Sequence, residues 1–287
     1  MKVKKRNGRL EDFNVEKINK CAERACEGLE NVSASQVILA AEIKLYDKVT
    51  TIEIDKSLIM SARSKIEYEP NYSLVAARLL LNTIYKEVFG EGVDSDANEF
   101  QYRKSFITNL RRLVREDILN PELVESYDLR ELSDKLDLTK DRNWKYLGIQ
   151  TIYDRYLLHI DERRMETPQA MWMRVAMGLA LNEAPEQRQE YALKFYEVLS
   201  SFDLVSSTPT LFNSGTTHSQ LSSCYLNTFD DSIDGIFDGL WQEARKSKYA
   251  GGLGFDITNF RSRDSFIKGT NGTNQGPVYF WKLYNDM

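Results

Sequence analysis

The chain has 287 residues, of which 42% are hydrophobic and 28% are charged, and its formal net charge is −5. This length accommodates about two domains of ordinary size. No window approaches the roughly 18 consecutive apolar residues of a membrane span, and the basic start MKVKKRNGRL lacks the apolar run of a secretory signal. We therefore predict a cytoplasmic globular protein that has no membrane role and, given its negative charge, no general nucleic-acid-binding surface.

Cysteine and histidine are too few and too scattered to predict a disulfide scaffold or a metal site. Cys21, Cys26 and Cys224 form no C-x-x-C pair, and the two histidines are His159 and His218. Neither set has the spacing of a zinc site. We expect no metal in this chain.

The first residues predict a β-hairpin followed by a helix. Residues 2–6 and 9–13 form two short runs around Asn7-Gly8, the dipeptide that best tolerates the positive φ angles of a tight hairpin turn. Asn14 is a good N-cap for the helix that follows. The apolar residues of that helix recur every three or four positions and predict one buried face. They are Val15, Ile18, Ala22, Ala25 and Leu29.

Three further helices complete a module that ends near residue 90. Ser33 with Gln36, and Thr50 with Glu53, have the spacing of capping boxes. The first pair predicts a helix that reaches Tyr46, and the second predicts a helix over IDKSLIMSARSKI. The last helix, YSLVAARLLLNTIYKEVF, is expected to stop at Gly90.

The polar, acidic stretch at residues 91–100 is predicted to link this module, residues 1–90, to a helical region at residues 101–202. Thr167-Pro168 begins a helix with proline at its first position. AMWMRVAMGLALNE and EQRQEYALKFYEVLSSF are amphipathic or apolar helices. We assign their methionines and aromatic residues to the core and not to chemistry.

From residue 203 the pattern becomes β-rich. LVSSTPTLFNSG and SSCYLNTF resemble short strands, a helix is expected over residues 232–249, and GLGFDIT is expected to be the next strand. A strand, a helix and a strand in about 35 residues predict a βαβ unit and a parallel sheet. The fold class is thus α+β and mostly helical, with an incomplete α/β barrel or doubly wound sheet at residues 203–287. An unfinished parallel sheet leaves an open edge, so we expect another polypeptide to cover it.

Taken singly, the candidate site motifs have ordinary structural interpretations. The KKR run is also typical of a solvated edge strand. Gly251-Gly252-Leu253-Gly254 precedes a strand instead of joining a strand to a helix, so it is not a dinucleotide fingerprint. Cysteines such as Cys224 are more commonly small buried side chains than reactive groups. The combination of motifs is more specific than any one of them.

The N-terminal module resembles the ATP-cone, the regulatory nucleotide-binding domain of ribonucleotide reductases. The resemblance covers residues 3–90 and rests on VKKRNG, Glu11, NVEKI and AARLLLNTIYKEVFG. It implies that ATP or dATP binds here as an allosteric effector, with charge-assisted contacts to the phosphates. Asp55 departs from the pattern, because related cones carry a basic or neutral side chain there. The implied contact residues are Val3, Lys5, Arg6, Glu11, Asn14, Lys17, Thr51 and Lys86.

The second half resembles the opening of the catalytic barrel of the class I ribonucleotide reductase large subunit. STPTLFNSGT, SSCYLNTFDDSIDGI, KYAGGLGFDITNFRS and FIKGTNG occur in the order of that family. The resemblance implies a ten-stranded α/β barrel in which ribonucleoside diphosphates are reduced through a thiyl radical. Cys224 resembles one of the two reducing thiols. Thr208 and Ser223 resemble substrate-contacting hydroxyls, and Gly252 lets the backbone approach the substrate.

The same resemblance implies a second effector site, which binds deoxynucleoside triphosphates at a dimer interface. Asp231 is expected to contact the ribose, while Arg261 and Lys268 face the phosphates. Ser232, Ile233 and Ile267 are expected beside them. Arg263 is as well explained by an exposed loop. The helix over residues 232–249 is expected to contribute to the dimer contact.

Several family elements are not found before Met287, including the thiyl-radical cysteine, the second reducing cysteine and the radical-relay tyrosines. Our leading hypothesis is the N-terminal part of a split reductase, inactive alone, that produces deoxyribonucleotides for DNA synthesis. Its expected partners are a complementary C-terminal chain, a second large subunit, a small subunit with a metal-based radical, and thioredoxin or glutaredoxin as reductant. The alternatives are a stand-alone nucleotide sensor without catalysis and an artificial truncation.

Overall fold

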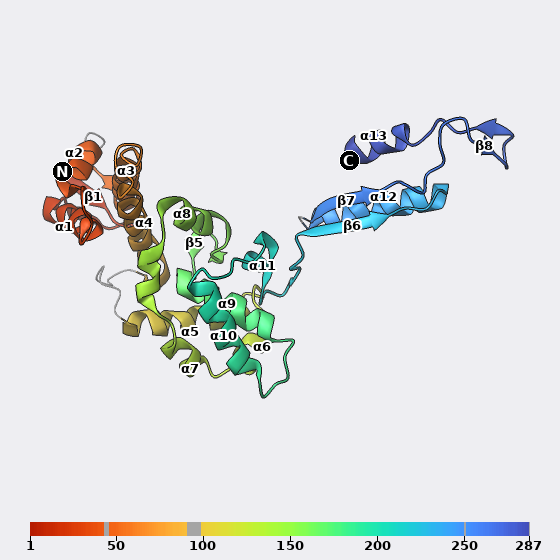
Figure 1. Ribbon diagram of the computed structural model, residues 1–287. Helices are drawn as coiled ribbons and strands as arrows, with labels where there is room; N and C mark the ends of the chain where they lie inside the picture. The colour runs from red at the N-terminus through yellow and green to blue at the C-terminus, as the bar shows by residue number, and fades with distance from the viewer. Residues whose placement is uncertain (43–45, 91–98, 250, 287) are drawn as a thin grey trace. The chain divides into compact units, whose positions relative to one another are not determined.

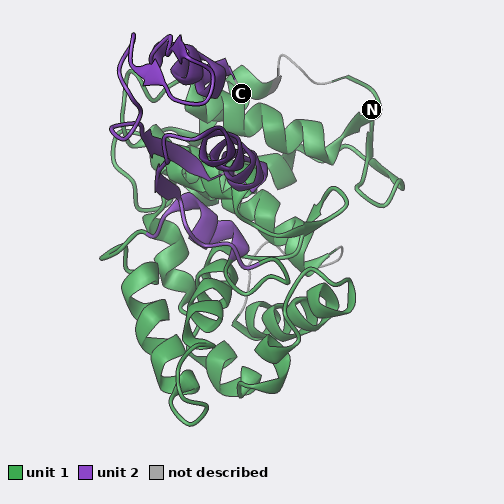
Figure 2. Ribbon diagram, turned by 90° about the vertical axis from the view of Figure 1, so that its right-hand side faces the viewer, with its two compact units in different colours: residues 1–205, 214–218 green, residues 206–213, 219–287 purple. Residues whose placement is uncertain are grey.

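The computed structural model describes residues 1–42, 46–90, 99–249 and 251–286 (Figure 1). The chain divides into two compact units (Figure 2). The first unit contains Met1–Val205 and Ser214–His218, and the second contains Ser206–Asn213 and Ser219–Met287. None of the helices in the described residues combines the length and the apolar character needed to cross a membrane.

The first unit begins with the predicted hairpin. Strands β1 (Lys2–Lys4) and β2 (Leu10–Asp12) are antiparallel, and Gly8 in the turn has φ +83°. A third strand, β3 (Val49–Thr50), pairs in parallel with β1, so the sheet order is β2-β1-β3. Strand β3 was not predicted, because two residues are too few to show alternation of polar and apolar side chains.

The four predicted helices of the N-terminal module are present. The Asn14 side chain accepts a hydrogen bond from the Glu16 amide, and Thr50 with Glu53 forms a complete capping box. Gly90, with φ +84°, follows the last helix as predicted. The second helix was predicted to reach Tyr46, but Tyr46 is not helical, so this prediction was wrong. Residues 43–45 lie outside the described part. The helices are α1 (Val15–Cys26), α2 (Ala34–Glu42), α3 (Thr51–Arg63) and α4 (Tyr72–Phe89).

The rest of the first unit is mostly helical, as expected. Thr167 caps α9, its hydroxyl accepting a hydrogen bond from the Ala170 amide, and α9 packs against α10. Of the predicted linker, residues 91–98 lie outside the described part and residues 99 and 100 already belong to a helix. The elements are α5 (Glu99–Arg115), α6 (Glu122–Glu125), α7 (Leu129–Asp134), the 3₁₀ helix η1 (Leu138–Asn143), α8 (Tyr146–Arg155), the antiparallel pair β4 (His159–Ile160) and β5 (Arg163–Arg164), α9 (Pro168–Ala180) and α10 (Arg188–Ser200).

The second unit contains the predicted βαβ unit. Strands β6 (Cys224–Thr228) and β7 (Gly252–Asp256) are parallel and are joined through α12 (Ile233–Lys248). Strands β8 (Phe266–Ile267) and β9 (Gly272–Thr273) form a hairpin before α13 (Val278–Asp286). A small core lies between α12, α13 and the segments that follow β6 and β7, and it consists of Phe229, Ile236, Phe260 and Tyr284.

One expectation for the second unit was wrong. The β-rich stretch 204–215 contains a short helix, α11 (Thr208–Asn213). Pro209 explains the difference, because proline has no amide N–H to donate. In the first turn of a helix that N–H would have no partner within the helix, whereas in a strand its absence removes a hydrogen bond to the neighbouring strand. The amide of Leu211 donates to the carbonyl of Ser207 across this turn.

Candidate functional site

A cavity of about 560 Å³ lies among β1, β2, α1, α3 and α4 of the first unit. Apolar side chains, including Ile18, Ile54 and Leu58, form part of its lining. Five basic side chains and three carboxylates also line it, so cations predominate. Seven of the eight residues predicted to contact ATP or dATP lie around this cavity: Val3, Lys5, Glu11, Asn14, Lys17, Thr51 and Lys86.

Local structure explains why these residues meet. Val3 and Lys5 are two apart along β1 and its extension, so they point to the same side. Lys17 and Cys21 are four apart on α1 and share one of its faces. Lys86 reaches the same space from α4, far along the chain.

Asp55 organises the buried end of the cavity. It is 9% exposed, and the Lys86 ammonium lies 2.9 and 3.1 Å from its two carboxylate oxygens. The Arg6 guanidinium, the eighth predicted contact residue, donates to the same carboxylate at 3.0 Å. This residue, noted as a departure from related cones, therefore holds two of the cations that were predicted to meet phosphate.

The exposed end of the cavity has a looser arrangement of charges. The Glu11 carboxylate lies 3.7 Å from the Lys5 ammonium and 3.5 Å from the Lys17 ammonium. Ion pairs of this length between exposed side chains contribute little to stability. An anionic ligand could displace Glu11 from both lysines at small cost.

Cys21 and Asn82 are among the lining residues that were not predicted from the sequence. The Asn82 amide donates to the Cys21 sulfur at 3.3 Å. Burial raises the pKa of the Cys21 thiol, so it remains uncharged and acts as part of the wall. Helical spacing from Lys17 and Lys86 was the signal that could have identified both residues.

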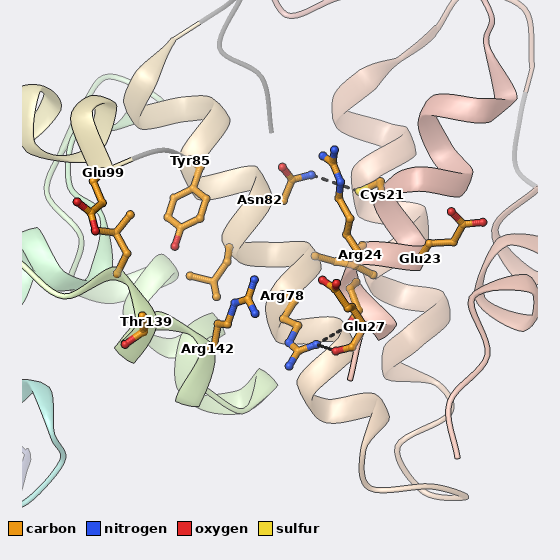
Figure 3. A pocket seen from close by; sticks show the side chains of 14 residues that line it. Cys21, Glu23, Arg24, Glu27, Arg78, Asn82, Tyr85, Glu99, Thr139 and Arg142 are labelled. Carbon is orange, nitrogen blue, oxygen red and sulfur yellow. Dashed lines mark hydrogen bonds between the residues drawn. The ribbon is translucent and has the colours of Figure 1, made fainter. Parts of the chain in front are cut away.

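A second, larger cavity of about 820 Å³ shares Cys21, Arg24 and Asn82 with the first and extends along α4 toward η1 and α5 (Figure 3). Its three arginines are matched by three glutamates in the lining. Arg78, one of these arginines, donates to the carbonyls of Ala25 and Glu27 at the end of α1, at 3.2 and 2.7 Å. The charges that line this larger cavity are therefore balanced, and they do not indicate an anionic ligand.

The second unit brings together three of the four predicted substrate-site residues. Cys224 is exposed at the start of β6 and pairs in register with Gly252 of β7. A Cβ atom on Gly252 would lie 3.4 Å from the Cys224 sulfur and 3.3 Å from the Ser223 carbonyl oxygen. The absence of a side chain at Gly252 thus leaves space beside the thiol.

Thr208, the fourth residue of that set, is the first residue of α11. This helix is attached to the segment that leads into β6, because the Thr210 hydroxyl donates to the carbonyl of Leu221 at 3.1 Å. Thr208 and Cys224 therefore belong to one compact unit. The contact of Thr208 with substrate stays a prediction.

The predicted specificity site is only partly assembled. The Arg261 guanidinium donates to the Asp231 carboxylate at 2.5 Å and to its carbonyl at 3.3 Å. The Ser232 hydroxyl accepts from the Gly235 amide and so caps α12, while Ile233 is exposed. Ile267 ends β8, and Lys268 follows it in the hairpin. The structure thus joins Asp231 to Arg261, as a pair that an effector would have to separate.

The part of the chain that the structure describes contains no group of three or more histidine, cysteine, aspartate or glutamate side chains that could hold a metal ion.

Three protein families match consecutive parts of the chain. The ATP cone domain matches residues 1–87, the all-alpha domain of ribonucleotide reductase matches residues 142–219, and its barrel domain matches residues 222–287. These matches cover the module with the cavity, much of the helical region and the βαβ unit with Cys224.

The chain is also similar to named large subunits. It is 44% identical to the ribonucleoside-diphosphate reductase subunit alpha of Chlamydia muridarum over 92% of this chain and 25% of that protein. It is 40% identical to the corresponding Helicobacter pylori subunit over 99% of this chain and 35% of that protein. The Monkeypox virus large subunit is 33% identical over 100% of this chain and 36% of its own length. The chain thus spans about a quarter to a third of the length of these relatives.

Proposed function

We propose that this chain, which belongs to the family of ribonucleotide reductase large subunits, combines an allosteric nucleotide site with the first part of a catalytic barrel. It represents an N-terminal part of those subunits. The cavity among β1, α1, α3 and α4 binds ATP or dATP. The second unit contributes Cys224 to the reduction of ribonucleoside diphosphates.

One observation carries the nucleotide proposal. Residues predicted from the resemblance, spread from position 3 to position 86, lie around a single cavity. Its apolar part suits a purine ring, and its lysines suit a triphosphate. Occupation by phosphate would compete with Asp55 for Lys86 and Arg6, and with Glu11 for Lys5 and Lys17.

Replacing Lys86 with methionine is expected to weaken ATP binding by about 10- to 100-fold, because a partly buried charge-assisted contact to phosphate contributes about 1.5–3 kcal/mol. Isothermal titration calorimetry of the purified chain measures this. Lys56→Met is the matched control, since Lys56 is exposed on α3 and does not line the cavity. Equal ATP affinity of Lys86→Met and the unchanged chain would contradict the assignment.

Replacing Asp55 with asparagine is expected to have the opposite effect. It removes the carboxylate that holds Lys86 and Arg6, so both cations become available to phosphate. We expect ATP to bind about 10-fold more tightly, and the empty protein to lose stability because two cations are left close together. Titrations at two salt concentrations measure the first effect, and thermal unfolding measures the second. Glu67→Gln removes the same charge from an exposed residue outside the cavity, so it should alter neither ATP affinity nor thermal stability.

For the barrel, the proposed reaction couples loss of the substrate 2′-hydroxyl to oxidation of two thiols. Cys224 supplies one thiol, which can protonate the departing hydroxyl and then share a disulfide with a second cysteine. A complementary C-terminal chain, corresponding to the part of the relatives that these 287 residues do not span, is the proposed source of the second cysteine, the radical cysteine and the remaining strands. A small subunit with a metal-based radical, a second large subunit, and thioredoxin or glutaredoxin are the proposed partners, in the cytoplasm.

The proposed regulation uses two effector sites. ATP in the cone cavity favours activity and dATP inhibits it, while deoxynucleoside triphosphates select the substrate base. Asp231, Arg261 and Lys268 form the second of these sites, and the ion pair between the first two opens when the effector binds.

A further inference from the structure

A buried carboxylate connects the cone to the helical region of the first unit. Asp141 in η1 is 1% exposed. The hydroxyls of Tyr85 and Tyr102 donate to its Oδ2 atom at 2.6 and 2.8 Å, and the Gln169 amide donates to Oδ1 at 2.8 Å. These three donors come from α4, α5 and α9. Within the described residues, no lysine or arginine forms an ion pair with Asp141, so hydrogen bonds alone balance its charge.

The network continues into α10. The Tyr196 hydroxyl donates to the side-chain oxygen of Gln169 at 2.9 Å and accepts from the Asp137 amide at 3.0 Å. The Gln169 amide of the backbone donates to the Tyr102 hydroxyl at 3.2 Å. Each buried polar group in this chain of contacts has partners, and leaving one unpaired would be costly in a dry interior. A small displacement of any helix that contributes to the network would therefore disturb these hydrogen bonds.

One of those helices also forms a wall of the proposed nucleotide cavity. Asn82 and Lys86 of α4 line the cavity, and Tyr85 precedes Lys86 directly. In Figure 3, Asn82 points from α4 toward Cys21, whereas Tyr85 lies on the side of Glu99 and η1. If the Lys86 ammonium moves toward a bound phosphate and α4 shifts with it, the Tyr85 hydroxyl also moves.

The same hydrogen bonds also affect the protonation of Asp141. Burial raises the pKa of its carboxyl to about 6, while the hydrogen bonds from Tyr85, Gln169 and Tyr102 lower it. Withdrawal of the Tyr85 donor removes one of the contacts that favour the ionised form. The carboxyl then takes up a proton more readily and changes from acceptor to donor.

Helix α9, which contributes Gln169 to the network, also holds the last segment of the first unit. Helix α9 carries Arg174, whose guanidinium donates to the Ser214 carbonyl at 2.9 Å. Ser214–His218 belongs to the first unit but is flanked on both sides by segments of the second. A packing change in α9 would therefore also act on Ser214–His218, the last segment of the first unit.

We propose that the hydrogen bond between Tyr85 and Asp141 is the positioning contact through which a nucleotide in the cone cavity alters α9 and α10. The inference rests on the proposed nucleotide site. Tyr85 does not line the proposed nucleotide cavity, and its role is to transmit the position of α4. By linkage, a change in α9 and α10 that weakens this contact also changes nucleotide affinity.

Hydrogen exchange measured by mass spectrometry on the whole chain, with and without saturating ATP, tests this proposal. We expect ATP to change the exchange rates of α9 and α10 amides by at least about twofold in the unchanged chain. Tyr85→Phe should remove this response. The phenyl ring keeps the stacking on Phe89, so ATP should still bind, and its dissociation constant should change only by the small coupling that is lost, within about threefold.

Tyr153→Phe is the matched control. The Tyr153 hydroxyl also bonds α4, through Glu87 at 2.9 Å, but lies outside the network, so this variant should respond to ATP as the unchanged chain does. An undiminished α9 and α10 response in Tyr85→Phe would overturn the inference. So would ATP binding without any change in these helices. Absence of ATP binding to the unchanged chain would instead overturn the proposed nucleotide site, and the inference with it.

Discussion

Replacing Cys224 with serine is expected to abolish ribonucleotide reduction in the assembled enzyme, that is, when the chain acts with the remainder of the large subunit and a small subunit. The structure places this thiol at an exposed position at the start of β6, with space beside it at Gly252. Serine has a similar size but cannot share a disulfide, so the two electrons for the reduction have no source. Turnover measured as deoxyribonucleotide formed should fall to the background of the assay.

The control for this experiment is Cys26→Ser. Cys26 ends α1 in the first unit and has no proposed part in the reaction, and burial raises the pKa of its thiol. This variant should retain turnover, and both variants should bind ATP normally. Unchanged reduction in Cys224→Ser would instead favour the alternative function, a nucleotide sensor in which the barrel segment takes no part in catalysis.

Replacing Arg174 with methionine is expected to lower the free energy of unfolding by about 3–5 kcal/mol, because it leaves a buried carboxylate without its cation. The Arg174 side chain is 1% exposed and pairs with Glu166 through two nitrogens, at 2.7 and 3.2 Å. It also donates to the carbonyls of Ser214 and Tyr156. Urea unfolding followed by circular dichroism measures the change.

Two further variants make this prediction specific. Arg103→Met removes an arginine of comparable size from partly exposed pairs with Glu99 and Asp134, and should cost at most about 1 kcal/mol. The double variant Arg174→Met with Glu166→Leu should be less destabilised than the sum of its single variants, because no unpaired charge remains. Equal effects of Arg174→Met and Arg103→Met would contradict the interpretation of the buried pair.

The local structure of this chain was largely predictable because its signals are short in range. Asn7-Gly8 predicts the hairpin, Thr50 with Glu53 predicts the start of α3, and Thr167-Pro168 predicts the start of α9. All three are confirmed. The stretch that contains Pro209 was misjudged, since serine, threonine and apolar residues suit both a strand and a helix start.

The site could be predicted only in part. Resemblance supplied seven of the residues that line the cavity. It did not supply the pairing of Asp55 with Arg6 and Lys86, which depends on helix packing across positions far apart in sequence. The role of Asp141 was missed for the same reason. In the polar stretch LTKDRN it has the appearance of a surface residue, and only tertiary structure surrounds it with Tyr85 and Tyr102.

The measurement that tests the central claim most directly is photo-crosslinking of the whole chain with 8-azido-ATP, followed by mass-spectrometric mapping of the modified peptides. The account predicts labelling within residues 3–24, 51–58 or 82–86, the segments that contain the cavity-lining residues. It also predicts that this labelling is lost when unmodified ATP or dATP is added in excess. Labelling confined to other parts of the chain, or labelling that excess ATP does not reduce, would contradict it.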